Sequence, residues 1–301
     1  MGYTPHVLVI GGGAVGTGVA RDLSMRGLEV TLVERDTLAG GTSGSMHALL
    51  HSGARYVVDE PDVAATCRRE NDVLRSIAAN LVTETGGLFV ALEGDASEYV
   101  ETHRAACESA GIPTESLSAS AARDREPTLS DGVADATAVP DAVIDPFALC
   151  AANAISAHDY GATVLTDTEV EAIQIDGDAI AAVEVESGGD RRKLTPDYVV
   201  NAAGPWAGQV AEMAGRRLPI QHSQGAMLVV ERTGLDAVVN RCRPRSEGDI
   251  AVPYGPAAVL GTTDRNISSP RSVDRQPAEV DFLVDELAPV VPAVATARPF
   301  R

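Results

Sequence analysis

Lysine is almost absent from this chain of 301 residues, because Lys193 is the only one among 24 basic residues. Aspartate and glutamate number 43, so the formal net charge is −19. Such a chain repels polyanions and anionic membrane surfaces, and we expect no nucleic acid partner. In concentrated salt, screening shortens the self-repulsion of the acidic side chains to a few ångströms. The scarcity of lysine favours a salt-adapted protein over the alternative, an ordinary acidic enzyme.

Long apolar runs are also missing, and none approaches the ~18 residues that predict a membrane-spanning helix. The first residues have no basic segment followed by an apolar stretch, so a signal peptide is not supported. We therefore expect a cytoplasmic protein. The four cysteines lie far apart and form no C-x-x-C pair, which is typical of small buried side chains and predicts no metal site.

A β-α-β unit begins the chain. An apolar run at 6–10 stops at a glycine, small and apolar residues recur at helical spacing over 15–26, and a second apolar run at 30–33 ends at Glu34. The two strands of such a unit are parallel and share one sheet. The sequence therefore predicts an α/β fold with a Rossmann-type dinucleotide-binding domain at its start.

Glycines occupy the turn of this unit in the pattern G-x-G-x-x-G. Gly11 permits the tight turn, Gly13 lets the backbone approach a pyrophosphate, and Gly16 lets the helix pack on the strand. Ala14 and Val15 begin the helix, whose free N–H groups and positive dipole end attract phosphate. We expect a dinucleotide site here. A glycine-rich turn that binds nothing is the alternative.

The residues after the second strand indicate which dinucleotide is bound. Glu34, at the end of that strand, can accept hydrogen bonds from both ribose hydroxyls. In a simple nicotinamide dehydrogenase a second helix would normally follow this acid at once, but here a segment of small residues comes next. Thr42, Ser43 and Ser45 of that segment could bind phosphate and ribityl oxygens through hydroxyl and backbone N–H groups.

Further along the chain, the pattern predicts a helix at 61–81, a helix that starts at Asp145-Pro146 and ends before Gly161, and a helix at 277–289. An Asp176-Gly177 turn indicates a hairpin. The expected strands lie at 87–92, 163–165, 170–175, 180–185, 198–202, 227–230, 250–252 and 259–261.

The segment 47–56 reads His-Ala-Leu-Leu-His-Ser-Gly-Ala-Arg-Tyr. Together with 40–45, it resembles the stretch that runs along the flavin in the glycerol-3-phosphate dehydrogenase branch of the amine-oxidase-like flavoproteins. The pairing of His51-Ser-Gly-Ala-Arg55-Tyr56 with Asn240-Arg-Cys-Arg is similar to the anaerobic A-type chain of that family rather than to the aerobic enzyme. The resemblance covers nearly the whole chain, with further matches at 86–89, 143–146, 199–206 and 261–264.

This resemblance implies FAD as the cofactor and a fold like that of the D-amino-acid and amine oxidases, with a second, mainly antiparallel-β substrate domain. It implies oxidation of sn-glycerol 3-phosphate to dihydroxyacetone phosphate, with electrons passed through B- and C-type partner subunits at the membrane to a quinone. Those subunits would hold the protein on the inner face of the cell membrane. We place the FAD domain at 1–84 and 145–215, and the substrate domain at 85–144 and 216–301.

Three residues of the segment 47–56 are the candidate catalytic group. Arg55 is the best anchor for a phosphate or an alcohol, because a guanidinium binds oxygens bidentately and stays charged. By resemblance, Tyr56 contacts the substrate. His51 is either a general base or an imidazole hydrogen-bonded to flavin or backbone, and the sequence leaves both open.

Further cofactor contacts are implied by the resemblance. Val170 is expected to grip the adenine through its backbone, with a plain strand as the alternative, and the turn at 201–204 returns to the pyrophosphate. Trp206, the only tryptophan, is a candidate to pack near the adenosine or in the core. The remaining expected contacts are Arg35, His47, Leu49, Ala203 and Gly204.

The sequence departs from the family in two places. It stops at residue 301, where the family continues into a Gly-Val-Arg-Pro turn and a Gly-Gly-Lys-x-x-Thr-Tyr-Arg loop, so we expect a truncated chain that lacks part of the substrate site. Gln224 stands where the family often has lysine or arginine. Rival functions are an amino-acid or amine oxidase of the same fold, with arginine binding a carboxylate, and a non-catalytic flavin-binding subunit.

A local basic cluster stands out in this acidic chain. Arg241, Arg243 and Arg245 lie within five positions of one another. They predict either a patch that faces a phosphate or a partner, or a set of solvated surface arginines.

Salt adaptation is tested by thermal unfolding. We expect the melting temperature to fall as salt is withdrawn, and the chain to unfold at low salt, because repulsion among the acidic side chains is then unscreened. Melting curves over a series of KCl concentrations measure this. A melting temperature that does not depend on salt would identify an ordinary acidic enzyme instead.

Overall fold

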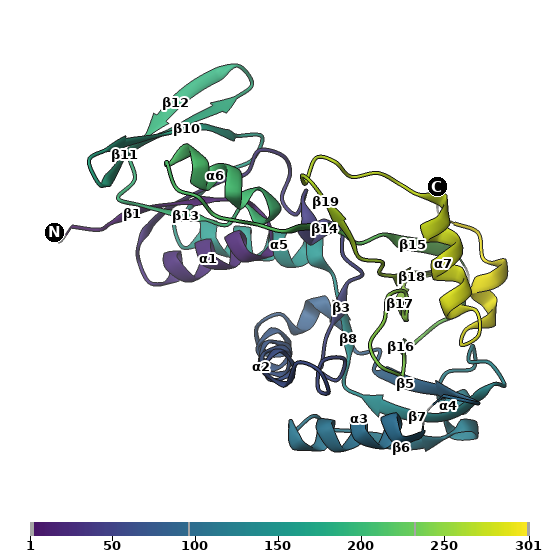
Figure 1. The fold of residues 1–301 in the computed structure, drawn as a ribbon. Helices are drawn as coiled ribbons and strands as arrows, with labels where there is room; N and C mark the ends of the chain where they lie inside the picture. Colours follow the sequence, from purple (N-terminus) through teal and green to yellow (C-terminus); the bar gives the residue numbers. More distant parts are fainter. Residues whose placement is uncertain (1–2, 96, 232, 300–301) are drawn as a thin grey trace. The chain divides into compact units, whose positions relative to one another are not determined.

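The computed structural model describes residues 3–95, 97–231 and 233–299 and divides into two units (Figure 1). The first joins the chain up to Met46 to Asp145–His222, and the second joins His47–Ile144 to the chain from Ser223 onward. The first boundary therefore differs from the one expected at residue 84. The reason is strand pairing, because β3 (Leu49–Leu50) and β4 (Val82–Thr83) both pair with β8 (Ala142–Ile144) of the second unit.

A parallel sheet lies at the centre of the first unit, with strand order β13-β1-β2-β9. Because side chains alternate along a strand, Val7 and Val9 face one side of the sheet, and Leu8 and Ile10 face the other. Both sides are buried, which is why these strands read as continuous apolar runs. The strands are β1 (His6–Ile10), β2 (Glu29–Val33), β9 (Thr163–Leu165) and β13 (Tyr198–Asn201).

Two helices cover one side of this sheet. α1 (Ala14–Met25) and α5 (Pro146–Asp159) pack there through Ala20 and Ala157. The predicted start of α5 is present, because Asp145 Oδ1 accepts hydrogen bonds from two N–H groups of the first turn and proline occupies the first helical position. Gly161, at a φ of +97°, follows the end of the helix.

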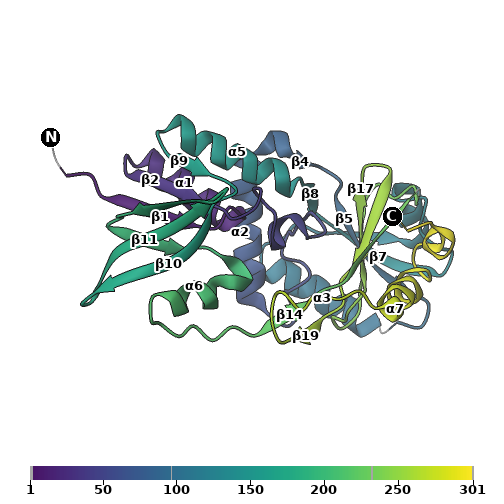
Figure 2. The same ribbon diagram turned by 90° about the horizontal axis from the view of Figure 1, so that it is seen from above.

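A three-stranded antiparallel sheet and α6 (Ala207–Met213) cover the other side (Figure 2). β10 (Glu169–Asp176) and β11 (Ala179–Ser187) form the predicted hairpin, and β12 (Asp190–Leu194) extends it. The sequence does not predict β12, because its residues are polar, largely exposed and without apolar alternation.

A seven-stranded sheet organises the second unit, in the order β15-β18-β17-β16-β5-β7-β6. Among the described pairs of this sheet, β16 with β5 is parallel and the others are antiparallel. The strands are β5 (Gly87–Leu92), β6 (Glu115–Ser118), β7 (Val133–Val139), β15 (Met227–Glu231), β16 (Val238–Arg241), β17 (Ile250–Tyr254) and β18 (Ala257–Gly261). The two-stranded sheet of β14 (His222–Gln224) and β19 (Arg265–Ile267) is separate.

Helices lie on both sides of the large sheet. α4 (Ala119–Arg125) and α7 (Pro277–Leu287) share an apolar cluster with Leu88 of β5. α2 (Pro61–Ile77) and α3 (Ser97–Ser109) share another with Phe89, the next residue of the same strand. No helix among the described residues is long and apolar enough to cross a membrane. Those residues also hold no group of three or more His, Cys, Asp or Glu placed for a metal ion.

Glu126, which is fully buried, ties two loops of the second unit together. Its Oε1 accepts hydrogen bonds from the N–H and the hydroxyl of Thr128 at 3.2 and 2.6 Å. Its Oε2 accepts the N–H groups of Asp236 and Ala237 at 2.9 and 2.8 Å. Every contact uses the side chain as an acceptor, so a carboxylate fits this position and an amide does not.

We expect Glu126→Gln to lower the free energy of unfolding by about 2 kcal/mol, because the amide NH₂ would face N–H donors and leave buried groups unpaired. Denaturant unfolding of the two proteins at the same salt concentration measures the difference. Glu115→Gln is the matched control, since Glu115 forms an exposed ion pair with Arg125 that should contribute under about 1 kcal/mol. Equal losses in the two variants would contradict the assigned role of Glu126.

Candidate functional site

A cavity of about 410 Å³ lies at the carboxyl ends of β1 and β2 in the first unit. Small-molecule sites commonly have volumes of ~300–1,000 Å³, and open α/β sheets bind ligands at the carboxyl ends of their strands. The cavity is lined by most of the expected cofactor residues, namely Gly11, Gly13, Ala14, Val15, Glu34, Arg35, Thr42, Ser43, Val170, Ala203, Gly204 and Trp206.

The glycine turn beside this cavity has no room for side chains. Gly11 has a φ of +114°, and a Cβ there would lie 2.4 Å from the carbonyl oxygen of Ala202. A Cβ on Gly16 would lie 1.8 Å from the carbonyl oxygen of Gly11, so Gly16 lies behind the cavity wall, where α1 meets the turn. Gly13 is the N-cap of α1 and has no side chain between the helix end and the cavity.

Glu34 is held against the turn by two backbone groups. Its Oε2 accepts the N–H of Gly12 at 2.6 Å, and its Oε1 accepts the N–H of Asp36 at 2.9 Å. These bonds fix the carboxylate in the cavity wall. Each carboxylate oxygen can accept more than one hydrogen bond, so ribose hydroxyls fit beside the backbone donors.

The small-residue segment brings a hydroxyl to the start of α1. Ser43 lies in η1 (Thr42–Gly44), and its Oγ accepts the N–H of Ala14 at 2.9 Å. The first turn of a helix has N–H groups without helical partners, so Ser43 stands at the end of the helix where a phosphate is expected. Ser45 is absent from the cavity lining, and its N–H bonds to the Thr42 carbonyl at 3.0 Å.

Trp206, which the sequence predicts either near the adenosine or in the core, lies in the wall of the cavity. The guanidinium carbon of Arg35 lies 4.1 Å from the centre of the Trp206 ring. The indole Nε1 is buried and has no hydrogen-bond partner among the described residues. An unpaired buried N–H costs ~1–3 kcal/mol, which a ligand acceptor would remove. The glycine turn, the helix end and this indole donor together fit a dinucleotide such as FAD.

Two other strands complete the wall of the cavity. β10 contributes Val170, whose side chain is buried in the core, so only its backbone could serve a ligand. The turn after β13 contributes Ala203 and Gly204, and Gly204 has a φ of +51°. Two expected cofactor residues, His47 and Leu49, belong to the second unit.

In that unit, Asn71 of α2 holds the backbone beside His51. Its Nδ2 donates to the carbonyl oxygens of Leu50 and His51, both at 3.1 Å. Its Oδ1 accepts a hydrogen bond from Arg75 Nε at 2.7 Å. Asn71 is fully buried, so all of its polar atoms are committed to fixing this segment.

Two more buried side chains hold the following residues. Asp141, which precedes β8, accepts the N–H of Ser52 at 2.7 Å, and burial raises the pKa of its carboxyl. His103 of α3 contacts the Ala54 carbonyl through Nε2 at 2.9 Å, and burial lowers the pKa of its ring. The segment that carries the candidate catalytic residues is therefore fixed from three different elements.

The structure brings the predicted catalytic residues His51 and Tyr56 into one row of rings. The ring centres of His47 and His51 are 5.7 Å apart, and those of His51 and Tyr56 are 5.4 Å apart. Burial lowers the pKa of His47 to about 4, and the charge of Arg55 adds to this. Burial also lowers the pKa of His51 to about 3, assisted by His47 and Arg55. An imidazole with so low a pKa is neutral at pH 7 but accepts a proton only weakly, so a general base and a hydrogen-bonded ring both stay open for His51.

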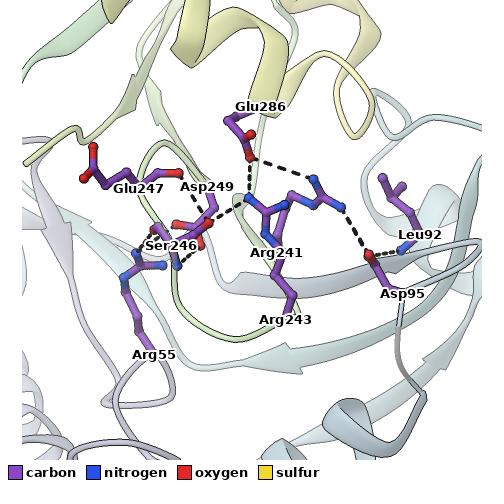
Figure 3. A network of polar contacts seen from close by, with 9 residues as sticks. All are labelled: Arg55, Leu92, Asp95, Arg241, Arg243, Ser246, Glu247, Asp249 and Glu286. Carbon is purple, nitrogen blue, oxygen red and sulfur yellow. Dashed lines mark hydrogen bonds and ion pairs between the residues drawn. The ribbon is translucent and has the colours of Figure 1, made fainter.

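Arg55 lies next to a carboxylate that the sequence analysis did not identify. Its Nη2 is 2.8 Å from Oδ1 of Asp249 and donates to the Ser246 carbonyl at 3.2 Å (Figure 3). The Arg55 side chain is 14% exposed and that of Asp249 is 1% exposed. Asp249 precedes β17, 194 positions along the chain, and no sequence pattern indicates that the two residues meet.

The arginines of the basic cluster at 241–245 are not the solvated surface arginines of one of the two predictions. Arg241 pairs with Asp95 at 3.3 Å, and Arg243 pairs with Glu286 of α7 (Figure 3). Arg245 pairs with Glu60 and lies over the ring of Tyr56, 5.4 Å from its centre. These arginines are partly buried and have carboxylate partners. They are therefore not a set of solvated charges, and a patch that faces a phosphate or a partner stays a prediction.

An arginine also comes close to Gln224, at the position where the family often has a basic residue. Arg265 Nη2 donates to Gln224 Oε1 at 3.2 Å. Arg265 also pairs with Asp274 and with Glu279, the latter at 3.8 Å. The positive charge at this point of the second unit therefore comes from β19 rather than from position 224.

A family model described as FAD dependent oxidoreductase matches residues 6–300. The chain therefore belongs to the FAD-dependent oxidoreductases, and the predicted fold class, an α/β dinucleotide-binding domain with a mainly antiparallel second domain, is confirmed. Phe300, at the end of this match, lies outside the described residues.

Among its relatives is the A1 chain of the anaerobic glycerol-3-phosphate dehydrogenase of Haloferax volcanii, 45% identical over 100% of this chain and 53% of the relative. The A chain of the anaerobic glycerol-3-phosphate dehydrogenase of Escherichia coli K12 is 40% identical over 98% of this chain and 55% of the relative. The chain thus spans about half the length of these relatives. The solved L-α-glycerophosphate oxidase of Mycoplasma pneumoniae has the same fold, with a TM-score of 0.81 at 22% identity over 99% of this chain and 82% of that one.

The low pKa values of His47 and His51 should make the fold sensitive to mild acid. Their pKa values in the folded chain, about 4 and about 3, lie below the unfolded value of about 6.5. Stability is therefore complete above pH 6.5 and is lost as the pH falls, because only the unfolded chain takes up these protons. Each histidine should contribute about 0.7 kcal/mol per pH unit at pH 6.5, and the contribution should approach about 1.4 kcal/mol per pH unit near pH 5.

Replacement of His51 by glutamine should remove the contribution of that histidine to the change of unfolding free energy with pH. Denaturant unfolding at several pH values and constant salt measures the slope in both proteins. A variant whose stability depends on pH as steeply as the wild type would show that the pKa of His51 is the same in the folded and unfolded chains.

Proposed function

We propose that this protein, with FAD bound, oxidises sn-glycerol 3-phosphate to dihydroxyacetone phosphate. The observation that carries this proposal is the 45% identity, over the whole chain, to one chain of an anaerobic glycerol-3-phosphate dehydrogenase. The segment 50–56 also supports the proposal. Hydrogen bonds from buried side chains fix its main chain, and it carries a neutral histidine and an arginine.

FAD would occupy the cavity of the first unit. The N-terminus of α1, with Gly13 and Ser43 beside it, would receive the pyrophosphate, because it combines free N–H groups with a positive dipole end. Glu34 would accept the ribose hydroxyls. Arg35 and Trp206 would flank the adenosine, whose polar atoms offer an acceptor to the unpaired indole N–H. His47, Leu49 and Ser45 stay proposed contacts to the flavin end.

The second unit would supply the groups that act on the substrate. Arg55 would bind the phosphate through its fork of N–H groups, with Tyr56 as a further contact. His51 would take the proton of the alcohol hydroxyl through a ring nitrogen. Bound FAD supplies the acceptor for the hydride that leaves the carbon.

The electrons would then leave through partner proteins. The named relatives carry the designations A1 and A within an enzyme of several subunits, which implies further chains. We propose that these are electron-transfer subunits of the B and C type, that a quinone is the final acceptor, and that they hold this protein at the inner face of the cell membrane.

An absorbance spectrum tests the reaction. The complete polypeptide, purified in high salt with added FAD, should show a flavin band near ~450 nm that bleaches when glycerol 3-phosphate is added without oxygen, because hydride transfer reduces the flavin. Glycerol without the phosphate, and an amino acid such as glycine, are the matched additions that should leave the band unchanged.

The outcomes separate the candidate functions. A band that bleaches with the amino acid and not with glycerol 3-phosphate would indicate an amino-acid oxidase. A band that no substrate bleaches would indicate a flavin-binding subunit without catalysis. Absence of the band after FAD addition would contradict the cofactor site in the first unit.

A further inference from the structure

We infer that Asp249 is a positioning residue, which holds the Arg55 guanidinium by its charge and leaves most of the guanidinium N–H groups open to an oxyanion such as a phosphate group. The inference rests on the proposed function, since it assigns the partner that sets Arg55 for its substrate. It assigns Asp249 the role of setting the geometry of an anion site. Asp249 lies in the loop between β16 and β17, far from the segment 47–56 in sequence.

The first observation is how the two side chains meet. Asp249 Oδ1 lies 2.8 Å from Arg55 Nη2, yet this oxygen has no aligned hydrogen bond among the described residues. The contact is therefore an attraction between charges without an aligned N–H···O bond. Arg55 Nη2 directs its hydrogen bond to the Ser246 carbonyl instead, at 3.2 Å.

The second observation concerns the other nitrogens of the Arg55 guanidinium. Nη1 and Nε of Arg55 make no hydrogen bond to any described residue. A guanidinium has five N–H groups in a planar fork, and one nitrogen is enough to anchor it here. The other N–H groups can form the paired bonds that phosphate oxygens accept. The guanidinium is held in one place, and the N–H groups that recognise an oxyanion make no hydrogen bond to the described residues.

The third observation is that Asp249 is itself rigidly placed. Its Oδ2 accepts the N–H of Ser246 at 3.2 Å, and its backbone carbonyl accepts the N–H of Arg241 at 3.1 Å. Ser246 Oγ in turn accepts a hydrogen bond from Arg243, which pairs with Glu286 of α7 (Figure 3). The carboxylate that positions Arg55 is thus fixed by the loop between β16 and β17, and that loop is fixed by α7.

Charge then decides what the pair can bind. A lone guanidinium that is 14% exposed would turn toward water, because burial of an unpaired charge is costly. With Asp249 beside it the guanidinium stays in place, and an incoming anion meets a formed site. Removal of the carboxylate has two opposite effects on anion binding. It weakens binding because Arg55 loses its fixed position, and it strengthens binding because a negative charge that repels the anion is gone. We expect the loss of position to be the larger, because Asp249 is the only described carboxylate paired with Arg55.

The test is Asp249→Asn in the complete, FAD-loaded polypeptide. Asparagine keeps the size and the Oδ acceptor for Ser246 and removes the charge. The KM for glycerol 3-phosphate should rise at least tenfold with little change in kcat, and calorimetry with inorganic phosphate should show binding weakened by a similar factor. In an Arg55→Ala background the same substitution should change neither value, because Asp249 acts through Arg55.

Asp95→Asn is the matched control, because Asp95 pairs with Arg241 and does not contact Arg55. It should keep the wild-type KM and phosphate affinity. If Asp249→Asn does not fold, Asp249→Glu carries the same test, since it keeps the charge and moves it by one methylene. The KM for glycerol 3-phosphate should then rise with kcat retained.

Two results would overturn the inference. One is an unchanged or lowered KM and an unchanged or tighter phosphate affinity in the Asp249 variant that folds, which would mean that the carboxylate only competes with the anion. The other is an equal effect of the substitution with and without Arg55. A wild-type protein that binds phosphate through Arg55 but is not reduced by glycerol 3-phosphate would contradict the proposed function and not the role of Asp249.

Discussion

The ion pair between Arg55 and Asp249 shows the constraint on which the polar interior of the second unit depends, namely that a charge removed from water needs an opposite charge beside it. Although the chain has a net charge of −19, several half-buried arginines of this unit are matched by carboxylates. Arg241 and Arg243 meet Asp95 and Glu286. Those partners lie on a loop and on α7, so charge matching adds to the apolar cluster that α7 shares with the large sheet.

The first unit is governed by a different constraint, which is space. Carbonyl oxygens approach Gly11 and Gly16 so closely that no side chain fits, and this brings the start of α1, the end of β2 and the turn after β13 to one cavity. The second unit fixes its candidate residues with buried hydrogen bonds, whereas the first fixes them with backbone contacts. A dinucleotide requires the bare backbone, and a small charged substrate requires oriented side chains.

Sequence patterns predicted the first unit well, because the glycine turn, the continuous apolar strands and the Asp145 cap are local signals. They did not predict β12, whose polar residues show no alternation, or the boundary at Met46, which depends on β3 and β4 pairing with β8. The sequence also did not predict which side chains hold the backbone of the segment 50–56. Asn71, His103 and Asp141 look like ordinary polar residues in the sequence, and only the folded chain brings them against its backbone.

The position of Trp206 has a practical consequence. The chain contains one indole, and that indole lies in the wall of the cavity with a guanidinium 4.1 Å from its ring centre. Its emission therefore arises from a single, known place in the first unit. Ultraviolet fluorescence gives a built-in optical probe of that wall, needing no label and no turnover, and it can be followed while salt, temperature or cofactor concentration is changed.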